Sequence, residues 1–306
     1  LAMRPMTGTK TRRGKRILEN REAKVHENDK KAILVKGGKT SETVSSAIRD
    51  LYLLKKPLAL QLKRRNPFHP FEDETPIEKF SAKFDSSLFL FGSNSKKHPN
   101  SLIFGRMFDG HLLDMAELRV LKYKPAAEFD TPRPVLGSKP CLVLEGPAFE
   151  SDEAMKRVGN LMVDWFRGPK LETVRLQGLE FVIVLTAHEN DIAFRVYRTV
   201  LLKSTTTTPR VELRELGPAI DFRLERKKLA SDSLFKEALK QPKELTRKKL
   251  RKNVTQDVMG NTLARIHIGK QGVDNLQTRK MKALKKGKKK GTEEEGEDTA
   301  EMETEE

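Results

Sequence analysis

The chain has 306 residues, a mass of 34.9 kDa and a formal net charge of +17, and 37% of its residues are hydrophobic. A single cysteine, Cys141, excludes an intrachain disulfide and indicates a reducing compartment. No apolar run reaches the roughly 18–20 residues that a membrane-spanning helix needs. The composition therefore excludes a membrane protein, a disulfide-stapled secreted module and a cysteine-rich zinc array.

The charge is unevenly distributed along the chain. Residues 1–31 carry a net charge of +6, residues 32–240 carry +7, residues 241–290 carry +13 and residues 291–306 carry −9. Segments with such an excess of one sign stay solvated and often serve as interaction tails. We predict a basic N-terminal arm, a folded domain, a basic C-terminal arm and an acidic disordered tail over these four ranges. Arms that contact nucleic acid are the main interpretation, and a solubility device or nuclear-import signal is the alternative.

The folded region begins with an apolar run at 32–36, which predicts a buried strand that Gly37 and Gly38 end. Thr40 or Ser41 can then cap a helix over roughly 41–54. Strands are predicted next at 58–62, 88–91 and 102–108, with a hairpin connection between the last two, and a short helix at 111–118.

A Pro-rich linker at 125–139 divides the folded region into halves at about 32–124 and 140–240. After the linker we predict a strand at 141–145, a helix from Ser151 or Asp152 to about Phe166, strands at 179–186, 192–202 and 211–224, and a last helix at 229–240. The order and length of the elements repeat at a spacing of about 110 residues. This repeat predicts an α/β fold of two similar halves packed as one body, with a coincidence of α/β order as the alternative.

Three apolar features of the second half carry further expectations. Trp165 and Phe166 close the apolar side of the predicted helix, so we expect them in the core, and an exposed partner-binding patch is the alternative. Cys141 begins a predicted buried strand and is expected to fill the core. The strand at 179–186 is so apolar that, at a sheet edge, it would need a partner strand or helix to cover it.

No motif in the sequence indicates catalysis. Residues 36–40 (Lys-Gly-Gly-Lys-Thr) invite a phosphate-loop interpretation, but Ile33 stands where the Walker pattern requires glycine. The six histidines are scattered, and none is spaced from another histidine or from Cys141 as metal ligands are. We therefore predict a non-enzymatic protein without cofactor or metal. An enzyme that processes RNA or nucleotides with the Gly37–Thr40 turn is the alternative.

Basic residues gather in clusters, and such clusters neutralise phosphates without reading bases. Aromatic residues make up 6% of the chain, and residues 241–290 contain none, so base stacking is not their main contribution. Structured RNA or an RNA–protein surface is therefore the expected ligand, with general nucleic-acid or chromatin binding as the alternative. The candidate RNA-binding residues are Lys63, Arg64, Arg65, Lys96, Lys97, Arg167, Lys170, Arg247, Lys248, Lys249, Arg251, Lys252, Arg279, Lys280, Lys282, Lys285 and Lys286.

A set of short motifs occurs in a fixed order along the chain. They are Lys36-Gly37-Gly38, Leu54-Lys55-Lys56-Pro57, Pro70-Phe71-Glu72-Asp73, Leu90-Phe91-Gly92-Ser93, Gly105-Arg106-Met107, Phe166-Arg167-Gly168-Pro169, Leu176-Gln177-Gly178-Leu179-Glu180, Gly217-Pro218, Leu229-Ala230-Ser231-Asp232 and Leu276-Gln277-Thr278-Arg279-Lys280-Met281-Lys282. In these motifs the chain resembles the Brix-domain family of ribosome-assembly factors, from about residue 10 to residue 286. The resemblance implies a Brix domain of two similar α/β halves and no catalytic activity.

The resemblance points to a nucleolar member of that family. It implies a tight heterodimer with the regulator-of-ribosome-synthesis protein, and no membrane partner. It also implies that the pair brings the 5S RNP, which is 5S rRNA with its two ribosomal proteins, into the precursor of the large subunit. The implied RNA ligands are 5S rRNA and large-subunit pre-rRNA. Arg279–Lys286 matches the family and is the safest RNA-contacting candidate, whereas the acidic tail and residues 124–140 lie outside the resemblance.

Overall fold

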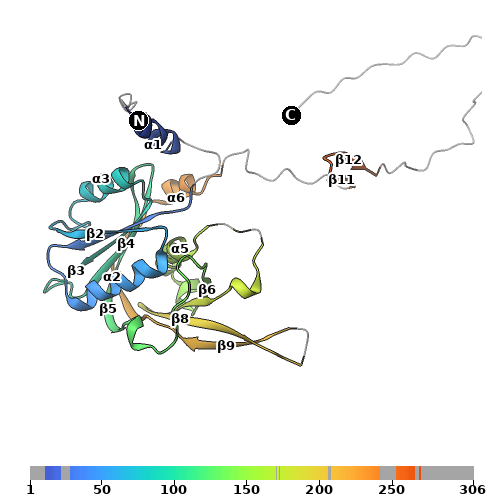
Figure 1. The fold of residues 1–306 in the computed structure, drawn as a ribbon. Helices are drawn as coiled ribbons and strands as arrows, with labels where there is room; N and C mark the ends of the chain where they lie inside the picture. Colours follow the sequence, from blue (N-terminus) through green and yellow to red (C-terminus); the bar gives the residue numbers. More distant parts are fainter. Residues whose placement is uncertain are drawn as a thin grey trace, which may run out of the picture. The chain divides into compact units, whose positions relative to one another are not determined.

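The structure is a computed structural model, and it describes residues 11–21, 28–169, 171, 173–205, 208–241, 253–265 and 269 (Figure 1). The chain divides into two compact units, residues 1–246 and 247–306. Most of both predicted arms, and all of the predicted acidic tail, lie outside the described residues. Across the described ranges, no helix has the length and apolar character needed to cross a membrane.

The first unit is built on a ten-stranded mixed sheet with the order β2-β1-β3-β4-β5-β10-β8-β7-β6, and β9 pairs with β8 beside this path. Helix α1 (Arg12–Arg21) precedes the sheet. The first half contains β1 (Ala32–Gly37), α2 (Glu42–Lys55), β2 (Ala59–Asn66), α3 (Thr75–Phe84), β3 (Leu88–Ser93), β4 (Ser101–Phe108) and β5 (His111–Lys124). The second half contains β6 (Cys141–Glu145), α4 (Ala148–Ser151), α5 (Glu153–Phe166), β7 (Phe181–His188), β8 (Asp191–Leu202), β9 (Arg210–Glu215), β10 (Ala219–Lys228) and α6 (Asp232–Ala238).

The predicted pair of similar α/β halves is confirmed by the pairing of the strands. In the first half, β1 runs parallel to β3, and β4 and β5 follow as antiparallel neighbours. In the second half, β6 runs parallel to β7, and β8 and β10 follow in the same way. An antiparallel pairing of β5 with β10 joins the two halves into one continuous sheet.

Helices α2 and α5 occupy equivalent places and pack on the same face of the sheet. Both begin at predicted caps, where Ser41 accepts a hydrogen bond from Val44 N and Asp152 accepts one from Ala154 N. Their apolar sides share one hydrophobic core with the strands below them. Trp165 and Phe166 are 0% and 3% exposed, so their predicted place in the core is confirmed.

The opposite face of the sheet differs between the halves. In the first half, α3 covers it, and Ile77 packs with Ile33, Phe89 and Phe91 in a second apolar core. In the second half, the helices α4 and α5 both contribute to the first core instead. This opposite face of the second half therefore has no counterpart of α3 among the described helices.

Two predictions about secondary structure are wrong. The predicted helix at 111–118 is part of the strand β5, in which residues 113–118 are all buried. A central strand that is buried on both faces lacks the alternation that distinguishes a strand from a helix. The predicted strand at 211–224 is two strands, β9 and β10, because a turn at Gly217 with φ +70° separates them.

Two expectations about strand positions are also wrong. Cys141 is only partly buried, because β6 is the last strand of the sheet and pairs on one side only. The apolar strand predicted at 179–186 corresponds to β7, which lies between β8 and β6 and is not an edge strand. In addition, β2 extends to Asn66, so the basic residues Lys63–Arg65 lie within the strand rather than after it.

Candidate nucleic-acid interface

The parallel strands β1, β2 and β3 bring basic residues to one edge of the sheet. Lys36 of β1 lies opposite Arg65 of β2 and opposite Gly92 of β3. Because the three strands run in the same direction, their carboxyl ends meet at this edge. Lys63 and Arg64 precede Arg65 on the outermost strand, and both are exposed.

The loop from β3 to β4 is fastened at the same edge and adds Lys96 and Lys97. Asn94 N donates a hydrogen bond to the carbonyl of Lys39 (2.9 Å). Ser41 Oγ, at the N-terminus of α2, donates to Asn100 Oδ1 (2.6 Å). The fold therefore places the end of β1, the start of α2 and the β3–β4 loop side by side.

We call this set the basic edge: Lys36, Lys39, Lys63, Arg64, Arg65, Lys96 and Lys97. Six of the seven side chains are exposed, and Lys36 is half-buried. Within the part of the chain that the structure describes, none of the seven forms an ion pair with a carboxylate. Uncompensated charge of one sign at one edge attracts a polyanion and steers its approach.

The other sequence-predicted site residues are not brought to this edge. Arg167 follows α5, whose Trp165 carbonyl accepts a hydrogen bond from Lys55 Nζ in the last turn of α2. Arg167 is therefore beside the C-terminal end of α2, whereas the basic edge surrounds its N-terminal end. The remaining candidates lie outside the described residues: Lys170, Arg247, Lys248, Lys249, Arg251, Lys252, Arg279, Lys280, Lys282, Lys285 and Lys286.

An ionic network joins the two halves at the other end of β3 and β4 from the basic edge, since Arg106 pairs with Leu88. Arg106 of β4 donates to Asp114 Oδ2 (2.9 Å from Nε) and to Asp164 Oδ2 of α5 (2.8 Å). Asp114 Oδ1 accepts a hydrogen bond from Ala230 N (2.7 Å), which holds the residues before α6 against β5. Burial lowers the pKa of the neighbouring Lys55 to about 8, and the charge of Asp164 opposes that shift.

A cluster of one histidine and two carboxylates was not predicted from the sequence. The ligand atoms of His98, Glu117 and Glu225 lie within 4.8 Å of one another. His98 Nδ1 is 3.0 Å from Glu225 Oε2, and Glu117 accepts hydrogen bonds from Ser101 and Arg226. These neighbours already occupy the carboxylate oxygens. Because His98 lies in the β3–β4 loop, Glu117 in β5 and Glu225 in β10, the cluster joins these three segments.

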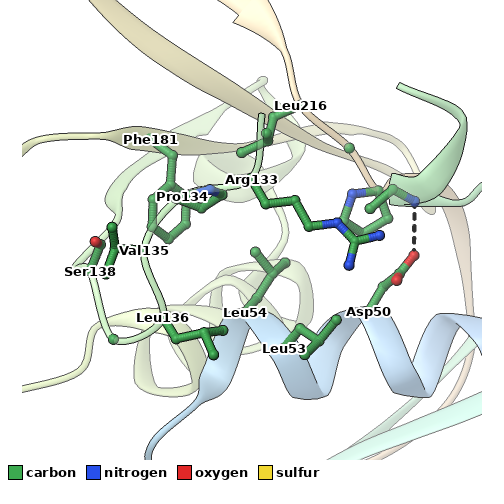
Figure 2. Close-up of a pocket in the computed structure, with 14 residues that line it drawn as sticks. Asp50, Leu53, Leu54, Arg133, Pro134, Val135, Leu136, Ser138, Phe181 and Leu216 are labelled. Carbon is green, nitrogen blue, oxygen red and sulfur yellow. Dashed lines mark hydrogen bonds between the residues drawn. The ribbon is translucent and has the colours of Figure 1, made fainter. Parts of the chain in front are cut away.

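A pocket of about 270 Å³ lies between α2 and the Pro-rich linker. Figure 2 shows Leu53 and Leu54 of α2 facing Pro134 and Leu136 of the linker, with the Arg133 side chain extending across the opening. The lining is mostly apolar.

The one carboxylate in this pocket is already engaged. Asp50 Oδ2 accepts from Tyr123 Oη (2.8 Å) and from Ala126 N (3.0 Å; Figure 2 shows the second bond). Burial, and next the hydrogen bond to Asp50, raise the pKa of Tyr123, so the phenol stays a donor. Asp50 therefore holds the start of the linker to α2, and the described pocket residues include no second carboxylate and no histidine, lysine or cysteine to complete a catalytic pair.

The uncovered face of the second half is a second candidate interface. Phe181 and Ile183 of β7 point toward α5, so the alternate residues Val182 and Val184 point to the other face. Val182 lies opposite Tyr197 of β8, and Val184 lies opposite Val143 of β6, which is 40% exposed. We call this surface the open sheet face.

Comparisons with known proteins identify the class of protein. The model of the Brix domain matches residues 37–226, so the chain is a Brix-domain protein. A probable ribosomal biogenesis protein from Aeropyrum pernix is among the similar solved structures, with a TM-score of 0.41 and 11% identity, covering 66% of this chain and 99% of that chain.

The comparisons also identify the particular family. "Ribosome production factor 2 homolog" of Caenorhabditis elegans is 60% identical over 278 residues, covering 90% of this chain and 93% of that protein. The Homo sapiens protein of the same name is 46% identical, covering 83% and 82%. "Ribosome biogenesis protein RPF2" of Saccharomyces cerevisiae is 39% identical, covering 93% and 86%. The chain belongs to the ribosome production factor 2 family, and it is a ribosome biogenesis factor.

Proposed function

We propose that this ribosome biogenesis factor binds rRNA without catalysing a reaction, and that it helps to bring the 5S RNP into the precursor of the large subunit in the nucleolus. The observation that carries the RNA-binding part is the basic edge, where seven cations lie together without carboxylate partners among the described residues. Binding there would release counterions and contact the sugar–phosphate backbone rather than base edges.

Heterodimer formation with the regulator-of-ribosome-synthesis protein is the second part of the proposal. It is supported by the difference between the halves, because α3 covers one sheet face and the equivalent open sheet face has no described helix over it. A partner helix placed there would bury Val143, which is 40% exposed, and the half-buried Val184, as α3 buries Ile33 and Phe89. The Arg195–Asp221 ion pair on the same face would lie at its polar border.

A non-enzymatic role is supported by the chemistry of two places where catalysis could be sought. The pocket beside the linker offers one carboxylate, Asp50, which is already hydrogen-bonded to Tyr123 and Ala126. Gly37 belongs to β1 and pairs with Asn66 of β2, so its backbone is part of the sheet rather than of a phosphate loop.

The experiment measures affinity for 5S rRNA at several salt concentrations, with the protein co-expressed with its partner. The variant Lys63→Gln/Arg64→Gln/Arg65→Gln removes three cations from the basic edge. We expect weaker binding and a flatter dependence of log affinity on log salt, by about 0.7–0.9 for each phosphate that the variant no longer neutralises.

The matched control is Lys79→Gln/Lys156→Gln/Lys236→Gln, which changes the net charge equally at exposed positions on three helices. If both triple variants flatten the salt dependence equally, the basic edge is not the binding surface. If duplex DNA competes as well as 5S rRNA, the protein is a general nucleic-acid binder. Tight magnesium-dependent binding of ATP or GTP would contradict the non-enzymatic part of the proposal.

A further inference from the structure

The second unit contains a hairpin with an apolar tip. Its strands are β11 (Val254–Gln256) and β12 (Thr262–Ala264), which pair antiparallel with Val254 opposite Ala264. Val258 and Met259, in the connection, are 101% and 85% exposed. A two-stranded hairpin is marginally stable on its own in water, so an exposed tip of this kind is best explained by a ligand that it contacts.

The turn holds the two apolar side chains outward in a defined geometry. Asp257 N donates to Asn261 O (2.9 Å), and Gly260 N donates back to Asp257 O (2.9 Å). Gly260 has φ +83°, which favours glycine, and Val258 N donates to Asp257 Oδ1 (2.8 Å). Arg265 N closes the base of the hairpin on Asn253 O (2.8 Å).

The charges on either side of the hairpin indicate the ligand. Residues 253–265 contain one acidic and one basic residue, whereas residues 241–252 carry a net charge of +5 and residues 266–290 carry +8. When the two basic sequences bind a polyanion, the neutral hairpin between them lies next to that polyanion. Proteins that kink duplex DNA combine backbone contacts with apolar wedges, Leu and Met among them, which they insert between neighbouring base steps.

We propose that the Val258–Met259 tip is an apolar wedge that inserts between stacked bases of the RNA. This inference rests on the proposed RNA binding and adds a specific contact that does not depend on charge. The wedge opens one base step, so it would favour a site where stacking is already weak, such as a bulge or an internal loop.

The test compares the full-length protein, co-expressed with its partner, with the variant Val258→Ser/Met259→Ser on 5S rRNA. We expect affinity to fall by about tenfold, because two apolar side chains that are buried between bases become polar, with an unchanged salt slope because both proteins neutralise the same phosphates. Probing of 2′-hydroxyl reactivity should show nucleotides that become reactive with the wild type and stay protected with the variant. Val135→Ser/Leu136→Ser, another exposed apolar pair, in the linker (69% and 63%), is the control and should bind as the wild type does.

The outcomes separate this inference from the proposed function. If the wild type does not bind RNA, the proposed RNA binding and the wedge are both refuted. If the wild type binds and the double variant binds equally with the same reactivity pattern, the wedge alone is refuted. If the variant keeps its RNA affinity but no longer binds a ribosomal protein of the 5S RNP, the tip binds a protein surface and the RNA wedge is equally refuted.

Discussion

Replacing Trp165 tests how the two halves depend on each other. Trp165 lies in α5 of the second half, is 0% exposed, and packs edge-on against Phe104 of the first half at 5.3 Å and 81°. Trp165→Ala leaves a large cavity in the shared core and should cost about 3–5 kcal/mol. That is a large share of the roughly 5–15 kcal/mol that stabilises a domain.

The milder variant Trp165→Phe removes the indole N–H but keeps an aromatic ring in the core. The indole Nε1 is buried and has no hydrogen-bond partner among the described residues, so a phenyl ring removes a polar group whose burial costs about 1–3 kcal/mol. This stabilisation offsets part of the free energy that the smaller side chain costs. We therefore expect Trp165→Phe to lower the free energy of unfolding by less than half as much as Trp165→Ala does.

The assay is urea unfolding followed by circular dichroism, because the substitution removes the only tryptophan. Since Trp165 and Phe104 belong to different halves, the alanine variant should unfold in one transition with a lower midpoint and an unchanged slope. A wild-type midpoint would refute the shared core. Two separate transitions, with one half unaffected, would refute the coupling of the halves.

Three further predictions concern charge. Because the pKa of Lys55 is about 8 in the fold and 10.5 in the unfolded chain, the unfolded state binds more protons between these pH values. The free energy of unfolding of the wild type should therefore rise by about 3 kcal/mol more than that of Lys55→Met across this window, and parallel pH profiles in urea unfolding would contradict the shift. Deleting residues 241–290 should weaken RNA binding and flatten the salt dependence, and an unchanged slope would show that the arm does not contact phosphates. Deleting residues 291–306, with nine carboxylates and one large apolar residue, should leave the melting temperature unchanged, whereas a drop of several degrees would show that the tail docks on the fold.

The sequence predicted those elements whose signals are local. Ser41 and Asp152 begin helices because their side chains satisfy free backbone N–H groups, and this chemistry is visible in the sequence. Helix α3 was missed, although Pro76 near its start and the apolar positions Ile77, Phe80 and Phe84 are typical of a helix.

The features that depend on strand order could not be predicted. Lys36 meets Arg65, and Asn94 meets Lys39, only because β1 lies between β2 and β3 in register. The basic clusters were visible as separate segments, but their meeting at one edge required the sheet topology. The same holds for His98 and Glu225, which are 127 residues apart in the sequence.

The role of the basic edge in recruiting 5S rRNA can be measured in cells. The variant Lys63→Gln/Arg64→Gln/Arg65→Gln would replace the wild type as the only copy, and large-subunit precursors would be purified through a tag on another assembly factor. The measured quantity is the ratio of 5S rRNA to large-subunit pre-rRNA, with Lys79→Gln/Lys156→Gln/Lys236→Gln as the charge-matched control. We expect precursors depleted of 5S rRNA in the basic-edge variant alone, at normal levels of the variant protein and its partner. Full 5S rRNA content in precursors from the basic-edge variant would contradict this role.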